Sequence, residues 1–274
     1  MDSQDQQQMP IDDLTICFTT FNSMRTMPRA LSAAGALTKK IVVVDSGSTD
    51  GTIDFCGKHG IEPVHRDWTN PAEQKKFAVS LCSGTIWTLV LDSDEVVLGD
   101  LAASIRTAIA NAAPDDTGFE LNRVTWLHAR PLRHAFQPEW ILRLVRFDAF
   151  DIKSNVGGVH ERLEVKSGRS ARLQGVLRHD AWIDVGDMLA RGVRWSNATG
   201  RAATRGGRIT NICFNPVIAF LKQLLLKRAF LDGWRGWAAA GAVAVGTLCK
   251  HIAILERRGL EKERAKGGVE PENS

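Results

Sequence analysis

The amino-acid sequence predicts an α/β fold with a parallel sheet, followed by amphipathic helices. Short apolar runs at 14–18, 41–44 and 87–91 have the length of buried strands. Stretches of helical length separate these runs, and such alternation is typical of a parallel sheet covered by helices. Ligands bind beyond the carboxyl ends of the strands in such sheets, and each run ends in polar residues. We therefore expect one binding site at this edge of the sheet.

The helices expected between these strands are about two to three turns long. Gly60 closes the second of them. After Asp100 the pattern becomes less regular, and strand-like segments predominate. The expected helices cover 27–37, 52–59 and 73–81, and the later strand-like segments cover 119–126, 141–147 and 172–179.

Composition narrows the class of protein. The chain has 274 residues, of which 44% are hydrophobic and 24% charged, and these values exclude a collagen, a disulfide miniprotein and a wholly disordered chain. The five Cys residues are scattered without the spacing of a zinc site or a disulfide framework, which suits a reducing compartment. The first ten residues have neither the basic nor the apolar region of a secretory signal, so we expect the protein in the cytoplasm.

Positive charge is concentrated in the C-terminal third. Residues 188–258 contain twelve Lys and Arg residues and two acidic residues, whereas the whole chain has a net charge of only +4. Such an asymmetry predicts an acidic surface or ligand, with nucleic acid and anionic lipid as the two candidates. Nucleic acid is not expected, because the basic residues alternate with aliphatic helix faces and not with base-stacking loops.

The apolar content of the same region favours a membrane surface. One amphipathic helix is expected to begin at Asn215 and Pro216 and to end near Gly233, and a second to cover 234–257. The apolar run of the second, 237–249, is shorter than the roughly 18 residues of a membrane span. We expect the helices to lie on an anionic bilayer. The alternative is that they pack on the preceding domain with a solvated basic face.

Two carboxylates follow the third apolar run, in Leu91-Asp92-Ser93-Asp94-Glu95. Both can reach one divalent cation, which would share its other positions with water and substrate phosphates. A nucleoside diphosphate compound is then the natural ligand. Taken alone, the Asp-x-Asp pattern is equally a polar loop or a helix cap.

A second motif follows the run 41–44, in Asp45-Ser46-Gly47-Ser48-Thr49-Asp50-Gly51-Thr52. Asp45 can accept hydrogen bonds from a base or ribose, and the two glycines permit tight turns. Ser48 or Thr49 can cap the next helix. A purely structural role would also explain Gly47, Ser48 and Asp50.

These motifs together resemble family 2 glycosyltransferases with the GT-A fold, and the chain is similar within them to lipopolysaccharide core β-glucosyltransferases. The resemblance covers most of 12–255. The sequence departs from the family pattern at Phe21, at Ser23-Met24 and at Lys76, which bears on the identity of the donor. The matching segments are 20–22, 43–52, 74–75, 91–95, 143–146, 159–161, His179 and 230–233.

The resemblance implies a metal-dependent, inverting hexosyltransferase, with Mg²⁺ or Mn²⁺ as cofactor. It would move glucose from a UDP-sugar to a membrane-associated glycan of the lipopolysaccharide core type, on the inner face of the cytoplasmic membrane. The expected GT-A domain covers 12–187, with a donor half at 12–100 and an acceptor half at 101–187. A basic, membrane-associating helical region follows at 188–258, and loose ends lie at 1–11 and 259–274.

The resemblance also implies roles for single residues. Glu161 is the expected catalytic base, with Asp180 as the alternative, and Glu95 is expected to order the Asp-Ser-Asp loop. His179 and the two arginines of the expected acceptor site could equally be structural. The expected donor-binding residues are Thr20, Asn22, Asp45, Lys75, Asp92 and Ser93, the metal ligands Asp92, Asp94 and His179, and the acceptor-binding residues His160, Arg143 and Arg146.

Two other functions fit the same fold. A transferase that glycosylates polyprenyl phosphate would use the same donor site but would need no general base, because its nucleophile is already ionised. A non-catalytic scaffold would keep the fold and the membrane association without binding a nucleotide.

Overall fold

The computed structural model describes residues 9–154, 161–204 and 207–266, and the chain divides into two compact units. The first unit comprises the chain up to Trp126 together with Pro138–Ala181. The second comprises Leu127–Gln137 and the chain from Trp182 onward. Each unit is described below by itself.

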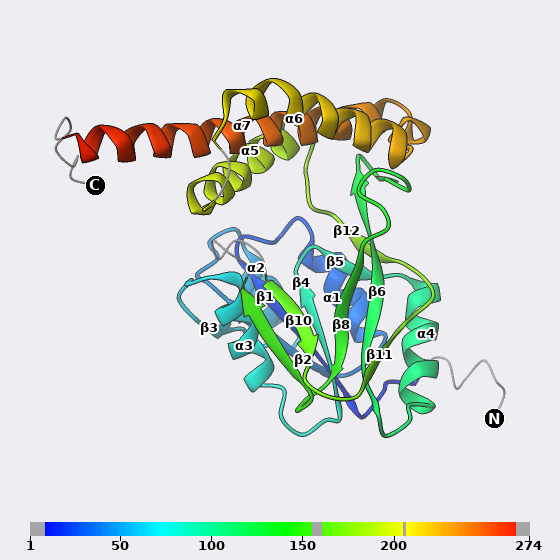
Figure 1. The fold of residues 1–274 in the computed structure, drawn as a ribbon. Helices are drawn as coiled ribbons and strands as arrows, with labels where there is room; N and C mark the ends of the chain where they lie inside the picture. The colour runs from blue at the N-terminus through cyan, green and yellow to red at the C-terminus, as the bar shows by residue number, and fades with distance from the viewer. Residues whose placement is uncertain (1–8, 155–160, 205–206, 267–274) are drawn as a thin grey trace. The chain divides into compact units, whose positions relative to one another are not determined.

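The first unit is built on a parallel sheet with the strand order β3-β2-β1-β4 (Figure 1). Strands β8 and β6 continue this sheet in antiparallel pairing, and β12 and β5 complete its path. The bounds are β1 (Leu14–Thr20), β2 (Lys40–Asp45), β3 (Val64–His65), β4 (Trp87–Asp92), β5 (Glu95–Val97), β6 (Asp116–Leu127), β8 (Trp140–Arg146) and β12 (Leu177–His179). The three strands expected from apolar runs are therefore confirmed as β1, β2 and β4.

Both faces of β1 are buried, as its continuous apolar sequence predicts. Leu14, Ile16 and Phe18 point into one core with α1, whereas Cys17 points into a second core on the opposite face with α3. Asn70 caps α3 by accepting a hydrogen bond of 3.0 Å from the Glu73 amide. The helices are α1 (Met27–Gly35), α2 (Thr52–Lys58), α3 (Pro71–Ser80) and α4 (Gly99–Ala110).

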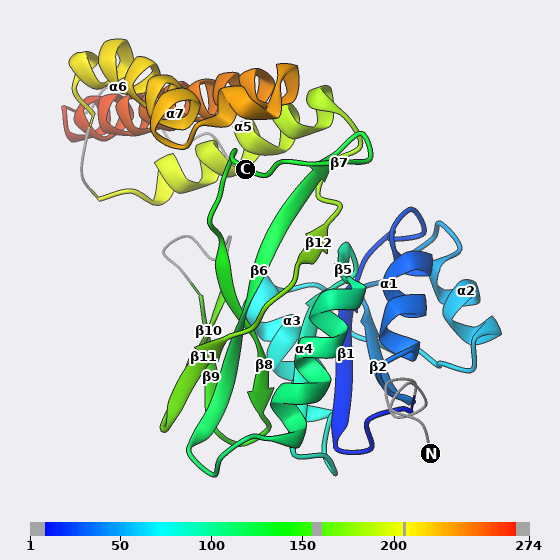
Figure 2. The same ribbon diagram turned by 90° about the vertical axis from the view of Figure 1, so that its right-hand side faces the viewer.

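The chain between α4 and the second unit is mainly extended. Strand β6 has 12 residues and runs beside β8 in the sheet (Figure 2). A separate antiparallel pair forms from β9 (Phe150–Ser154) and β10 (Glu161–Val165). Strand β11 (Arg169–Arg172) pairs with β6, and the two-residue strand β7 (Arg130–Pro131) lies in the second unit.

The second unit consists mainly of three helices. They are α5 (Val185–Ala202), α6 (Ile209–Leu221) and α7 (Trp234–Ala265), with a π-helical turn η1 (Lys222–Leu226) and a 3₁₀ turn η2 (Ala229–Asp232) before α7. Helix α7 packs against both α5 and α6. The close approach to α5 depends on Gly200, where a Cβ would lie 2.6 Å from the Lys250 carbonyl oxygen.

The helix boundaries expected in this unit were wrong. Helix α6 begins at Ile209, six residues before Asn215, and Pro216 lies inside it. The apolar residues before Pro216 extend the amphipathic face, which outweighs the loss of one backbone hydrogen bond at the proline. Helix α7 continues to Ala265, and the ion pair of Arg257 with Glu261 supports its last turns.

Both apolar helical segments are long enough to cross a membrane by length and composition. They are Ile209–Leu226, with a mean hydropathy of 1.4, and Trp234–Ala265, with 1.6 in its most apolar window. This finding corrects the expectation that the second helix is too short to span. A core helix of a soluble protein can pass the same test, so the finding by itself does not locate either helix.

Candidate active site

The carboxyl ends of β1, β2 and β4 lie side by side, as expected for neighbouring parallel strands. Thr20 is opposite Asp45 in the register of β1 and β2, and Thr19 is opposite Asp92 in the register of β1 and β4. The polar residues that follow the three strands therefore meet at one edge of the sheet. The convergence expected from the sequence is confirmed.

Asp45 is the centre of a buried hydrogen-bond cluster at this edge. Its Oδ2 accepts from Thr20 Oγ1 at 2.6 Å and from Ser48 Oγ at 2.5 Å, and its Oδ1 accepts from the amides of Gly47 and Ser48 at 2.8 and 2.7 Å. Burial raises the pKa of Asp45, but the hydrogen bonds from Ser48 and Thr20 outweigh burial, so its pKa lies below the ordinary value. The ionised carboxylate thus orders the loop after β2.

The loop after β1 is joined to the loop after β2. Asn22 adopts a left-handed conformation with φ of +49°, its amide donates to Ser48 Oγ at 2.8 Å, and its Oδ1 accepts from the Thr49 amide at 2.9 Å. Asp50 accepts from the Met24 amide at 2.9 Å and from Thr52 Oγ1 at 2.5 Å. The two loops therefore form one rigid wall, and the motif residues 45–52 have a structural role in it.

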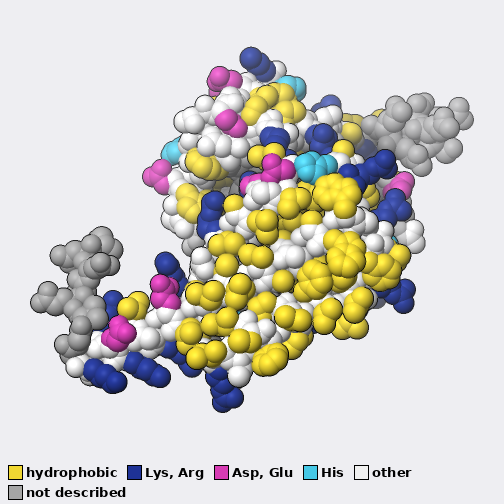
Figure 3. All heavy atoms as spheres, turned by 90° about the horizontal axis from the view of Figure 1, so that it is seen from above, with side chains coloured by type: hydrophobic (Ala, Val, Ile, Leu, Met, Phe, Trp, Pro, Cys, Tyr) yellow, Lys and Arg dark blue, Asp and Glu magenta, His cyan; other side chains and the backbone are white. Residues whose placement is uncertain are grey.

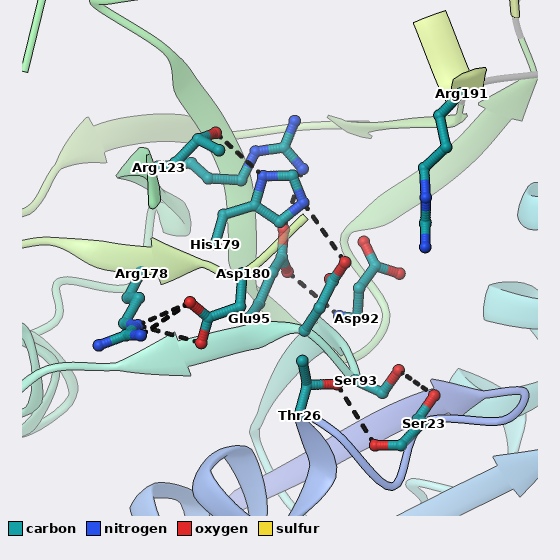
Figure 4. Close-up of polar contacts among 12 residues, drawn as sticks. Ser23, Thr26, Asp92, Ser93, Glu95, Arg123, Arg178, His179, Asp180 and Arg191 are labelled. Atoms are coloured by element: carbon teal, nitrogen blue, oxygen red, sulfur yellow. Dashed lines mark hydrogen bonds and ion pairs between the residues drawn. The ribbon is translucent and has the colours of Figure 1, made fainter. Parts of the chain in front are cut away.

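Ser23 joins this wall to the loop after β4. Its hydroxyl oxygen lies 2.7 Å from Ser93 Oγ, and its amide donates to Thr52 Oγ1 at 2.9 Å (Figure 4). Ser23 is buried. In the sequence Ser23 stood out only as a departure from the family pattern. Its small hydroxyl side chain, just after the first strand, is the signal that could have identified the contact with Ser93.

Asp94 and His179 form an ion pair at the site. Strand β12 pairs with β5, and this pairing brings His179 Nε2 to 3.6 Å from Asp94 Oδ2. Thr125 Oγ1 lies 3.2 Å from His179 Nδ1 and holds the ring. Burial raises the pKa of Asp94, but the charge of His179 and its hydrogen bond outweigh burial and lower that pKa. Two of the three expected metal ligands are therefore adjacent.

Asp92, the third expected ligand, belongs to a buried network of ion pairs. Lys75 Nζ lies 2.7 Å from Asp92 Oδ1 and also contacts Glu161 Oε1, and Arg143 Nη2 lies 2.9 Å from Asp92 Oδ2. Burial raises the pKa of Asp92, but the positive charges of Lys75 and Arg143 outweigh burial and hold that pKa well below its usual range. Asp92 keeps 31% of its side chain exposed, so it still reaches the open edge.

Glu95 anchors the other end of the network. It is fully buried, its Oε2 accepts from the Asp92 amide at 3.1 Å, and its Oε1 lies 3.0 Å from Arg143 Nη2 and 3.1 Å from Arg123 Nη1. The expected role of Glu95 in ordering the Asp-Ser-Asp loop fits this geometry. Arg123, which also pairs with Glu139 at 2.6 Å, is a member of the network that sequence reasoning missed.

Glu161, the expected base, lies at the edge of this network. Lys75 contacts its Oε1, and Arg143 Nη1 lies 3.6 Å from the same oxygen. Its side chain is 12% exposed. Lys75, expected beside the diphosphate of the donor, is only 2% exposed and holds the carboxylates instead.

Several expected roles need correction. Arg143 is buried among three carboxylates, so it does not reach an acceptor as it stands. Arg146 lies opposite Trp87 at the far end of β4 and donates to the Asp116 carbonyl oxygen at 2.9 Å, because it is three positions further along the strand than Arg143. Asp180, the alternative base, is buried and paired with Arg29 and Arg178. His160 lies outside the described residues.

The donor set fits a divalent cation that also binds substrate. Within residues 9–154, 161–204 and 207–266, no group of three or more His, Cys, Asp and Glu side chains is arranged to hold a metal ion. The pair formed by Asp94 and His179, with Asp92 close in sequence and partly exposed, offers two or three ligands. Mg²⁺ is commonly bound by one or two carboxylates together with water and substrate phosphates. The arrangement suits such a site better than a closed structural one.

Comparison with known proteins identifies the first unit. Residues 15–121 match the family model described as glycosyl transferase family 2. The chain carries a family 2 glycosyltransferase domain. This domain includes the strands that end at the site, and the family and the enzyme class expected from the sequence are thereby confirmed.

Relatives of this glycosyltransferase support the same assignment. The lipopolysaccharide core biosynthesis glycosyltransferase LpsC of Rhizobium meliloti is 25% identical over 237 residues, which cover 81% of this chain and 84% of LpsC. An uncharacterized glycosyltransferase of Rickettsia conorii is 34% identical over 96 residues, which span about a third of each protein: 35% of this chain and 34% of that one. The expected likeness to lipopolysaccharide core glycosyltransferases is confirmed at this level.

Two solved structures resemble the chain loosely. Glucosyl-3-phosphoglycerate synthase from Mycobacterium tuberculosis, in complex with Mn²⁺ and UDP-glucose, gives a TM-score of 0.43 at 12% identity and covers 66% of this chain and 76% of its own. Residues 1–349 of S. aureus TarS give a TM-score of 0.40 at 12% identity, with 94% and 93% covered. The expected α/β fold with C-terminal helices is confirmed by the strand order and helices of the glycosyltransferase itself.

Proposed function

We propose that the protein is a metal-dependent, inverting hexosyltransferase that moves glucose from a UDP-sugar to a membrane-associated glycan of the lipopolysaccharide core type. One observation carries the proposal. The Asp45 cluster and the pair of Asp94 with His179 meet at one edge of the sheet, and the contact between Ser23 and Ser93 joins them. The likeness to LpsC supports the class of acceptor.

The wall formed by the loops after β1 and β2 would bind the nucleoside of the donor. Asn22 is exposed, and the Thr20 and Asp45 side chains are fixed against each other, so the wall is rigid before the donor arrives. A site that is already ordered loses less conformational entropy on binding. Ser93, held by Ser23, would lie beside the ribose.

Asp94 and His179, with Asp92, would hold Mg²⁺ or Mn²⁺ at the diphosphate of the donor. When bound, the cation neutralises negative charge on the departing nucleoside diphosphate. Lys75 and Arg143 hold Asp92 ionised and fixed, so its carboxylate is ready to ligate. His179 is oriented by Thr125, and such support of a ligand is typical of metal sites.

Glu161 would act as the general base. Lys75 and Arg143 both contact Oε1 and fix the carboxylate, and Oε2 would take the proton of the acceptor hydroxyl. The hydroxyl oxygen then attacks the anomeric carbon as the bond from that carbon to the diphosphate breaks. Attack from the face opposite the leaving group inverts the configuration.

The test is the release of UDP from UDP-glucose with a purified lipopolysaccharide core acceptor, in Mn²⁺ and in EDTA. Glu161→Gln should lose transfer while keeping donor binding, whereas Glu164→Gln, on the same strand but exposed and paired with Lys153, should keep both. Full activity of Glu161→Gln with polyprenyl phosphate would favour transfer to that lipid. Failure of every nucleotide to bind would favour a scaffold.

We also propose that the two units of the chain have different roles. The first unit would carry the chemistry, and the basic helical second unit would associate with the inner face of the cytoplasmic membrane. The excess of Lys and Arg in 188–258 and the two apolar helical segments support this location.

A further inference from the structure

The second unit exposes a continuous apolar surface. Eleven large hydrophobic residues between 209 and 237 are exposed, with accessible fractions from 43% to 77%. On α6 and η1, Phe214, Val217, Ile218, Leu221 and Leu225 recur at spacings of three or four residues and so share one side of the helix. We call this set the apolar face; it comprises Ile209, Phe214, Val217, Ile218, Leu221, Leu225, Leu226, Phe230, Leu231, Trp234 and Trp237. Figure 3 shows a broad hydrophobic area on this side of the molecule, with Lys and Arg at its margin.

The opposite side of α6 packs against α7. Asn215 Nδ2 lies 2.8 Å from His251 Nε2 of α7, and the rings of Phe220 and Trp237 lie 6.1 Å apart. Leu224 is buried. The members of the apolar face on α6 and η1 are therefore exposed and available to a partner, whereas Trp237 contacts Phe220 and still leaves 53% of its surface exposed.

The charges around the apolar face are almost all positive. Arg208, Lys222 and Arg228 are exposed within or beside it. The segment 209–237 contains a single acidic residue, Asp232. Asp232 accepts hydrogen bonds from the amides of 133–135 and is 5% exposed, so it adds little negative charge to the surface. An apolar surface with a cationic margin is complementary to anionic lipid headgroups over hydrocarbon.

The packing of α5 on α7 indicates how the unit would meet a bilayer. The Gly246 position of α7 approaches Ser196 of α5, and Gly200 of α5 approaches Lys250 of α7, so the two helices are in contact along the apolar part of α7. Helix α5 carries exposed arginines at 194 and 201. If α7 crossed the bilayer in this packing, those arginines would enter hydrocarbon, which is unfavourable for a charged side chain. A position in the interfacial plane avoids that cost.

We propose that the apolar face docks on an anionic lipid bilayer, with α6 and the start of α7 lying in the plane of the interface and their apolar side chains inserted below the headgroups. The inference deepens the membrane association in the proposed function by naming its surface and orientation. It does not depend on the identity of the donor or acceptor.

The test is co-sedimentation of the full chain with vesicles of phosphatidylcholine alone or mixed with phosphatidylglycerol. The wild type should bind the mixed vesicles more tightly, and added salt should weaken the binding. Ile218→Asp and Leu225→Asp should each weaken it roughly tenfold or more, because each removes an exposed aliphatic side chain that would insert into the bilayer and adds a negative charge. Ile86→Asp, a matched change at an exposed residue of the first unit, should bind as the wild type does.

Lys222→Gln with Arg228→Gln should weaken binding to the mixed vesicles and leave binding to phosphatidylcholine unchanged. Equal binding by the wild type and both Asp variants would overturn the proposal. So would a wild-type dimer in solution that the Asp variants convert to monomers without any vesicle binding, because the face would then belong to a second copy. Titration of the same variants with UDP measures nucleotide affinity at the donor site independently of vesicle binding. Failure of the docking proposal and failure of the proposed function are therefore distinguishable.

Discussion

Replacement of Arg143 by Met should destabilise the first unit strongly. The Arg143 guanidinium contacts Glu95 at 3.0 and 3.1 Å and Asp92 at 2.9 Å, and all of these groups lie in or beside the core of the site. Removal of one partner from a buried ion pair costs about 3–5 kcal/mol. Arg123 still contacts Glu95, and Lys75 still contacts Asp92, so we expect the lower end, about 3 kcal/mol.

Thermal unfolding measures this effect. A loss of about 3 kcal/mol corresponds to a decrease in melting temperature of roughly 6–12 °C for a unit of this size. Arg146→Met is the matched control on the same strand, because Arg146 is hydrogen-bonded to backbone carbonyls and not to a buried carboxylate. We expect the control to lose only about 1 kcal/mol. A melting temperature of Arg143→Met equal to that of Arg146→Met would refute the reasoning about the network.

The same substitution should change the response to acid. The pKa of Asp92 is lowered in the folded state, so its ionised form contributes stability that is fully present above the unfolded pKa of about 3.9 and is lost as the pH falls toward the folded pKa. Without Arg143 the folded pKa of Asp92 rises. Acid unfolding of Arg143→Met should therefore begin at a higher pH than that of the wild type, as circular dichroism would record.

Three further substitutions test the wall and its supports. Ser23→Ala should raise the Kd for UDP about fivefold and lower the melting temperature by only about 2–4 °C, because one hydrogen bond of ~1 kcal/mol holds Ser93; an unchanged Kd in calorimetry would contradict that role. Asp45→Asn should lower the melting temperature and make it decline less as the pH falls below the ordinary Asp pKa of about 3.9, because the lowered pKa of Asp45 makes its stabilising contribution disappear in acid. Asp180→Asn should cost about 2 kcal/mol of stability yet keep nucleotide affinity within about twofold, and a large loss of affinity would restore Asp180 as a site residue.

The strands that position the site were predictable because their apolar runs are unbroken. β1 and β4 are buried along almost their whole length, β2 is buried over its last three residues, and polar residues follow all three strands at once. Helices α1, α2 and α3 begin within two residues of the expected positions. The pairing of His179 with Asp94 came from the family resemblance, since the two residues are 85 positions apart and only the register of β12 with β5 joins them.

The buried network could not be read from the sequence. Its members come from separate segments, and the pattern Arg143-Leu-Val-Arg146 is the same whether an arginine is exposed or buried. The register of β4 with β8 determines which of the two arginines joins the buried network, because it places Arg143 beside Asp92 and Arg146 beside Trp87. In the second unit, Pro216 suggested a helix start, although tertiary packing against α7 sustains the helix through it.

Calorimetric titration of UDP into the full chain, in Mn²⁺ and in EDTA, tests the central claim most directly. We predict saturable binding in Mn²⁺, loss of most of the affinity in EDTA, and a weakening of about 10–100-fold in Asp94→Asn. Asp100→Asn, in the first turn of α4 and outside the site, should bind as the wild type does. Equal affinity in Mn²⁺ and EDTA, or an unchanged Asp94→Asn variant, would contradict a metal-dependent donor site at this edge of the sheet.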